Sequence, residues 1–267
     1  MTRAALLLVL AALASGCGSS GGHDVLADTA QNLNKIKSGD LALRLVVAPR
    51  EGTKGRIGFE LHGPFALRPG ALPLAHVAYT QIRGAHESTA TFISTGTKAY
   101  AEINGKVYEL PPAATESIRR ASATGGGSGL GGLDIGSWVE HPSVSSEGEL
   151  QHVSADLDVV DAANGLLGLL RGLGSDAPTI DGHEADRLRD AVDSSSFDVW
   201  TREQDHLLRR LLLRADLGLD VPPTLQRVLG KVVGAKVDFE LAVAHPNEAV
   251  TVEPPKHPLP ASELPGG

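Results

Sequence analysis

Large apolar residues recur at every second position along much of this chain, and this alternation limits the fold more than any other feature. A period of two is the spacing of β-strands, in which successive side chains point to opposite faces. The clearest stretches are 41–47, 57–61, 153–159, 197–201, 211–217 and 237–243. Strands with one apolar and one polar face favour an antiparallel sheet, because a parallel sheet is buried on both faces.

Weaker strand patterns lie between residues 77 and 110. Val77 and Tyr79 predict one strand, and residues 89–94 predict another. Asn104 and Gly105 form a strong tight-turn signal, so the segments on either side of them are expected to pair as a hairpin.

Four segments show the spacing of amphipathic helices. The first two cover residues 26–37 and 111–121. A third follows the strand at 153–159, with Asp161 as its expected N-cap, and the fourth covers residues 182–192. Such helices must bury their apolar stripes against the apolar face of the sheet. The sequence therefore predicts an α+β fold, in which a curved antiparallel sheet wraps around amphipathic helices.

The N-terminus has the form of a secretory signal peptide. Arg3 precedes an apolar run at 4–14, and small residues stand directly before Cys17, the only cysteine. The apolar run is about half of the ~20 residues that a membrane-spanning helix needs. An ordinary signal peptide with an incidental cysteine is one interpretation of this segment.

The same segment resembles a bacterial lipoprotein signal with its lipobox, although Ala14 stands where that motif favours leucine. The resemblance implies that residues 1–16 are removed and that Cys17 is lipidated on its sulfur and its amino group. Two or more acyl chains give stable anchoring. The protein would then be held on the outer face of the cytoplasmic membrane, in the cell envelope.

The rest of the chain divides into three parts. Residues 17–22 are rich in glycine and serine and are expected to be a flexible tether. Residues 23–250 show no internal boundary and are expected to form one domain. Residues 251–267 hold five prolines and are expected to form an extended tail.

Several functional classes find no support in the sequence. The formal net charge is −8, which argues against nucleic acid as a partner. Motifs for a nucleophilic serine, a zinc protease or a phosphate loop are not found, and the ten histidines show no metal-ligand spacing. Asp156, Asp158 and Asp161 could hint at a cation site, but a strand face and a helix cap explain them better. The chain is therefore expected to be a non-enzyme without a metal or cofactor.

Three longer passages resemble the LppX/LprG/LprA-type actinobacterial lipoproteins, which are related to the LolA and LolB lipoprotein carriers. These passages are 96–108 with its tyrosine hairpin, 141–158, and 197–217 with Trp200 before an Arg/Leu-rich strand. The resemblance implies a half-barrel around an apolar cavity. It further implies that the protein binds acyl chains of a lipid or lipoglycan and carries or presents that lipid in the envelope, without catalysis.

The apolar strand face gives the candidate ligand residues. They are Leu43, Leu45, Ile57, Phe59, Leu61, Leu211, Leu213, Val237, Phe239 and Leu241. Periodicity does not separate a cavity from a filled core, so a surface-anchored scaffold or interaction module is the alternative function. Trp200 is expected in the core, and the helix at 111–121 with the glycine-rich segment 125–132 is expected to form a lid.

Overall fold

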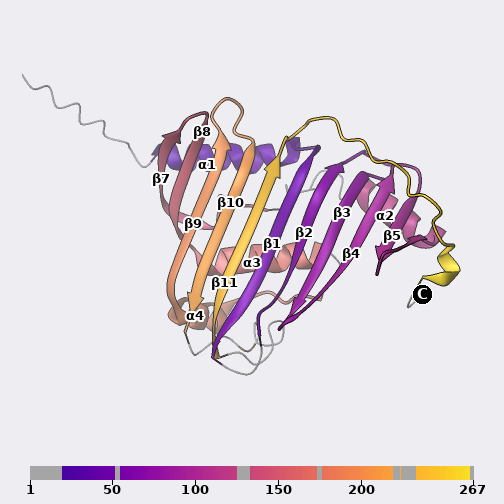
Figure 1. Cartoon of the computed structure of the whole chain (residues 1–267). Helices are drawn as coiled ribbons and strands as arrows, with labels where there is room; N and C mark the ends of the chain where they lie inside the picture. Colours follow the sequence, from indigo (N-terminus) through magenta and orange to yellow (C-terminus); the bar gives the residue numbers. More distant parts are fainter. Residues whose placement is uncertain are drawn as a thin grey trace, which may run out of the picture.

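The computed structural model describes residues 20–51, 55–124, 133–172, 176–218, 223 and 233–264. Its strands form one eleven-stranded sheet in the order β6-β5-β4-β3-β2-β1-β11-β10-β9-β8-β7 (Figure 1). Every neighbouring pair within the sheet is antiparallel. Together with four helices, this open, curved sheet confirms the predicted α+β class.

The strands follow the alternating stretches of the sequence, except that none was predicted at 139–147 and that the strand predicted at 153–159 ends at Leu157. Their bounds are β1 Ser38–Glu51, β2 Ile57–Ala66, β3 Leu74–Arg83, β4 His86–Thr95, β5 Ala99–Ile103, β6 Lys106–Glu109, β7 Val139–Glu147, β8 Leu150–Leu157, β9 Val192–Arg202, β10 Leu208–Leu217 and β11 Val233–Ala244. The first strand pairs with the last at the centre of the sheet. Strands that are neighbours in the sequence then extend the sheet outward on both sides, to β6 at one edge and β7 at the other, with two helices inserted between β8 and β9.

The β5–β6 turn is the tight hairpin that its sequence predicts. Asn104 and Gly105 both have positive φ, at 52° and 73°. A two-residue turn of this kind matches the twist of the flanking strands, and asparagine and glycine adopt it most readily.

The helices are α1 Ser20–Asn32, α2 Pro112–Thr124, α3 Val159–Gly172 and α4 Gly182–Ala191. α1 begins earlier than predicted, so residues 20–22, which were expected to be tether, are helical. The expected cap of α3 was wrong by three residues. Asp158 Oδ1 accepts hydrogen bonds from the backbone N–H groups of Val160 at 2.9 Å and Asp161 at 3.0 Å.

One face of the sheet, here called the inner face, carries α1, α3 and α4 (Figure 1). These helices cover β1 and β7–β11, which we call the covered half. β2, whose inner-face side chains pack at the margin of the two apolar clusters, and β3–β6 form the open half. α2 follows β6 at the far end of the sheet. The inner-face residues of the covered half form two apolar clusters, one with α1 and one with α3 and α4.

The two tryptophans lie on opposite sides of the sheet. Trp138, in the turn before β7, is only 1% exposed and packs edge-on against Phe197 at 6.5 Å between ring centroids. Trp200 was wrongly expected in the core. It lies on the outer face, stacked on His152 with ring centroids 4.4 Å apart, because its position on β9 alternates with the inward Val199.

The proline-rich C-terminal segment is extended, and part of it is hydrogen-bonded to β6. Leu259 forms a parallel bridge with Tyr108 of β6, through Glu109 N–H to Leu259 C=O at 2.9 Å and Leu259 N–H to Val107 C=O at 2.8 Å. The segment therefore covers part of the β6 edge.

Candidate functional site

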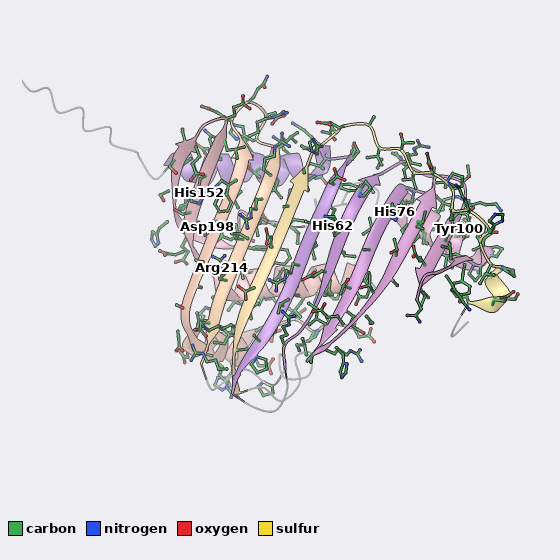
Figure 2. The ribbon with its side chains drawn as sticks, in the orientation of Figure 1. His62, His76, Tyr100, His152, Asp198 and Arg214 are labelled. Carbon is green, nitrogen blue, oxygen red and sulfur yellow. The ribbon has the colours of Figure 1, made fainter. Side chains whose placement is uncertain are left out.

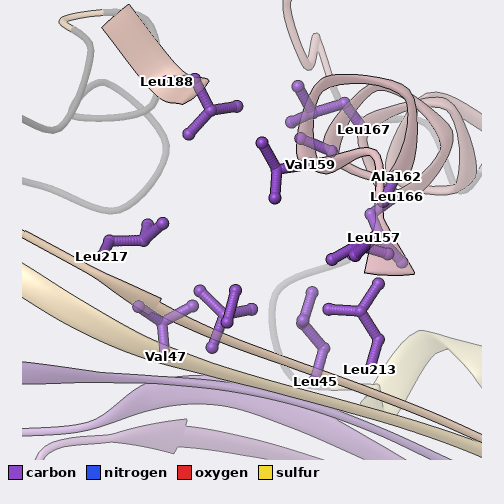
Figure 3. Close-up of a pocket in the computed structure, with 13 residues that line it drawn as sticks. Leu45, Val47, Leu157, Val159, Ala162, Leu166, Leu167, Leu188, Leu213 and Leu217 are labelled. Carbon is purple, nitrogen blue, oxygen red and sulfur yellow. The ribbon is translucent and has the colours of Figure 1, made fainter. Parts of the chain in front are cut away.

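An apolar cavity of about 120 Å³ lies between the inner face of the covered half and the helices α3 and α4 (Figure 3). The sheet contributes side chains from β1, β10 and β11, and the helical layer contributes those of α3, α4 and the end of β8. Its lining is Leu45, Val47, Leu157, Val159, Ala162, Ala163, Leu166, Leu167, Leu188, Leu213, Ala215, Leu217 and Val237.

The cavity presents only aliphatic side chains. Leucine, valine and alanine make up the described lining, so none of these side chains can donate or accept a hydrogen bond. A cavity of this chemistry gives a water molecule no polar partners and remains dry or takes up an apolar guest. The described lining can therefore bind hydrocarbon, and none of its side chains is an acid, a base or a nucleophile.

Small residues leave space between the two layers. Ala162 and Ala163 face the cavity from α3, and Ala215 faces it from β10. Longer side chains at these three positions would fill the space between helix and sheet. The cavity therefore results from three alanines among the leucines and valines of its lining.

Polar contacts outside the cavity hold α3 in place. The Asn164 side-chain amide donates to the Ile180 carbonyl at 2.9 Å and accepts from the Ile180 N–H at 2.8 Å. Arg171 Nη1 donates to the carbonyls of Ala177 and Pro178 at 3.1 and 2.9 Å. These bonds fix residues 177–180 against α3, so the helix side of the cavity is preorganised.

The structure divides the ten predicted ligand residues into three groups. Leu45, Leu213 and Val237 line the cavity. Four others, each at most 4% exposed, belong to the cluster under α1, and they are Leu43, Leu211, Phe239 and Leu241. Ile57, Phe59 and Leu61 lie on β2 in the open half, where they are half-buried. All ten share the inner face, but the described cavity includes only three.

Most of the cavity lining was not among the predicted ligand residues. Val47, Ala215 and Leu217 continue the same strand alternation and were available from it. Leu166, Leu167 and Leu188 lie on the apolar faces of α3 and α4, which the helical spacing indicated. Helical spacing shows which face is buried, but it does not show which strands that face will meet.

The expected lid receives no support from the described residues. α2 forms as predicted, but it contributes no residue to the cavity lining. The glycine-rich segment 125–132 and Cys17 both lie outside the described residues.

The inner-face rows continue from the cavity onto the open half. Leu45 pairs with Phe59 of β2, and Leu43 pairs with Leu61, which in turn pairs with Tyr79 of β3. The rings of Phe59 and Tyr79 are 6.2 Å apart at 32°, and Tyr79 is 40% exposed. An apolar guest that outgrows the cavity would therefore meet further apolar surface on β2 and β3.

Charged groups gather on the outer face instead. Figure 2 labels His152, Asp198 and Arg214 on strands of the covered half. His152 lies between two carboxylates, with Nε2 at 2.8 Å from Asp198 Oδ1 and Nδ1 at 3.2 Å from Glu147 Oε1. Arg214 pairs with Asp238 at 3.6 Å. Alternation along each strand separates these charges from the cavity on the other side of the sheet.

In the described part of the chain, no helix is both long and apolar enough to cross a membrane.

Comparisons with known proteins give structural likenesses only. No protein-family model matches the chain, and no curated protein matches its sequence. The structure is similar to that of LprF from Mycobacterium bovis, with 12% identity and a TM-score of 0.42 over 91% of this chain and 100% of that one. It is also similar to a LolA superfamily protein from Nitrosomonas europaea, with 7% identity and a TM-score of 0.21 over 83% and 93% of the two chains. The names match the groups that the sequence resembles, but likenesses at this level do not say what the chain binds.

Proposed function

We propose that this protein binds the acyl chains of a lipid or lipoglycan between its sheet and its helices, and that it carries or presents this lipid in the cell envelope without catalysis. A lipid anchor on Cys17 would hold it at the membrane. The observation that supports the proposal is the wholly aliphatic cavity between α3, α4 and the covered half.

The energetics of such binding are those of hydrocarbon burial. Each methylene group removed from water contributes about 0.8 kcal/mol. Ten buried methylenes would therefore contribute about 8 kcal/mol before the costs of association, with no polar contact required.

The size of the cavity sets a condition on this binding. At about 120 Å³ it is close to the engineered cavity of ~150 Å³ that binds benzene, and smaller than the roughly 300–1,000 Å³ of ordinary ligand sites. A long acyl chain would have to part α3 from the sheet or extend along the apolar rows toward Phe59 and Tyr79.

The proposal is tested on the chain from residue 17 onward carrying Cys17→Ser, which removes the lipid acceptor. Native mass spectrometry with lipid extraction would detect bound lipid, and a fluorescent fatty-acyl probe would measure affinity. Stoichiometric lipid or saturable probe uptake supports the proposal. An empty protein that also rejects the probe would favour the scaffold or interaction module.

A matched pair of variants places the binding site. Ala163→Leu fills the cavity from α3 and is expected to weaken probe binding about tenfold, which corresponds to about 1.4 kcal/mol. Ala78→Leu makes the same change on the outer face of β3, opposite His62, and is expected to leave binding unchanged. Equal effects of the two variants would exclude this cavity as the site.

A further inference from the structure

The N-terminal end of α1 is packed directly on the edge strand β7. A Cβ atom added to Gly22 would lie 2.7 Å from the carbonyl oxygen of Pro142, so the two backbones touch. One turn later, Val25 and Leu26 are 7% and 0% exposed in the core. The first turn of α1 therefore has no freedom to swing away from β7 without opening the core.

The distance from this fixed point to Cys17 is short. Cys17 lies three residues before Ser20, where α1 begins. Three residues span at most about 11 Å even when fully extended. If Cys17 carries the lipid anchor, as the proposed function states, the corner formed by α1 and β7 must stay within about 11 Å of the lipid surface.

The open half lies far from that corner. β7 is one edge of the sheet, and β4 is eight strand positions away from it. Adjacent strands lie about 4.8 Å apart, so β4 is roughly 38 Å from β7 along the sheet. The tether is too short to span this distance.

The charge of the anchored corner opposes a flat orientation on an anionic bilayer. Between Arg120 and Arg171 the sequence contains seven Asp or Glu residues and no Lys or Arg. Glu140, Glu147 and Asp156 are among them, on β7 and β8. Anionic lipid head groups repel such a surface, so this part of the protein is held near the bilayer by its anchor and not by adsorption.

We infer that the protein stands on the bilayer that carries its anchor with the α1–β7 corner down and the open half of the sheet directed away. The half-exposed apolar residues Phe59 and Tyr79 then face the envelope space rather than the anchoring membrane. A lipid bound across the inner face would be presented outward, to an acceptor beyond that membrane. The inference rests on the lipid anchor of the proposed function.

The orientation is measured on the full-length lipidated protein in phospholipid vesicles. Cys17 is the only cysteine and its sulfur would be consumed by the lipid, so one new cysteine can be labelled with a fluorophore. Ser145→Cys places the label on β7, and Ser88→Cys makes the same exchange on β4. With a quencher attached to the lipid head groups, we expect the Ser145→Cys label to be quenched several-fold more than the Ser88→Cys label.

The opposite ranking, or equal quenching at both positions, would overturn the orientation. A second measurement lengthens the tether with fifteen Gly/Ser residues inserted between residues 19 and 20, which gives a mean reach of about 21 Å. This insertion should remove most of the difference between the two labels, and a difference that persists would mean that something other than the short tether orients the domain.

Membrane anchoring and acyl binding are measured in separate experiments, so the failure of one can be distinguished from the failure of the other. Lipidated protein that does not float with vesicles would overturn the anchor and the orientation together. Acyl binding is measured on the Cys17→Ser chain and does not depend on either result. The Cys17→Ser chain should not adsorb to anionic vesicles, and adsorption would contradict the repulsion argued above.

Discussion

The covered and open halves of the sheet are built from the same alternation, yet they differ in burial. One inner-face row shows this across five strands, because Leu211, Leu241, Leu43, Leu61 and Tyr79 are cross-strand neighbours. Leu211 and Leu241 are 0% exposed and Leu43 is 4% exposed, while Tyr79 is 40% exposed. Exposure rises along the row as it leaves the cover of the helices.

The two halves of the sheet therefore have different roles, one in stability and the other in exposing apolar side chains. The covered half holds both apolar clusters and should account for most of the stability, because burial of apolar area is the main favourable term in folding. The open half keeps apolar side chains near solvent, where a hydrocarbon guest can reach them. The predictions below test this division from the largest expected effect to the smallest.

The largest contrast is expected between two aromatic residues. Trp138→Ala removes a fully buried ring from the covered half and should lower the free energy of unfolding by about 3–5 kcal/mol. Tyr79→Ala in the open half should cost less than about 1 kcal/mol, because the ring is already 40% exposed. Chemical denaturation of both variants gives the comparison, and equal losses would contradict the division.

The second contrast lies within α3. A Cβ on Gly165 would come within 2.4 Å of the Trp138 ring, so Gly165→Ala should destabilise the protein by about 1–3 kcal/mol despite the better helix propensity of alanine. Among the described residues, a Cβ on Gly168 would meet Arg171 Nη2 at 3.5 Å, an ordinary van der Waals contact. Gly168→Ala should therefore stabilise the protein by up to about 1 kcal/mol. Thermal unfolding of both variants tests the close packing of α3 on Trp138. A gain in stability in both variants would refute this packing.

The third prediction concerns the edge of the open half. Leu259→Pro removes the N–H that donates to Val107 and should free the C-terminal segment at a cost of about 1 kcal/mol. Leu259→Ala keeps that N–H and serves as the control. Hydrogen exchange should show faster exchange at Glu109 only in the proline variant, with denaturation of the covered half unchanged.

The smallest effect is electrostatic and depends on pH. The Arg202 side chain hydrogen-bonds to Asp205, with Nε at 2.9 Å from Oδ1, and lowers the pKa of that carboxyl. Because the folded-state pKa lies below the unfolded one, the ionised carboxylate stabilises the fold above about pH 4. This contribution disappears as the pH falls through the folded-state pKa.

Asp205→Asn should therefore reduce the difference in stability between pH 7 and pH 3, by less than about 1 kcal/mol because the pair is partly exposed. Asp186→Asn changes the exposed pair with Arg189 and provides the comparison. Denaturation curves at the two pH values measure this difference. If the change in stability between pH 7 and pH 3 were the same in Asp205→Asn as in the original protein, the ionised Asp205 would not contribute to stability as argued.

The sequence predicted most of the strands because each of these carries its own evidence, whereas β7 has no clear alternation and was not predicted. The alternation at 211–217 and 237–243 reports which residues share a face, and that face is the same whatever packs on it. The Asn104–Gly105 turn was predictable for the same local reason. The expectation that Trp200 lies in the core went against this same evidence, because its position on β9 alternates with the inward Val199.

The sequence by itself determined the secondary structure, the antiparallel class and the aliphatic character of the inner face, since these follow from short-range periodicity. Only the tertiary structure decided that α3 and α4 lie over β1, β10 and β11, so that Leu45, Leu213 and Val237 border a cavity while Phe59 and Leu61 stay half-buried on β2. The physical reason is that periodicity fixes the direction of a side chain relative to its own strand. What it meets there depends on the path of other chain segments, such as α3, which begins more than a hundred residues after Leu45.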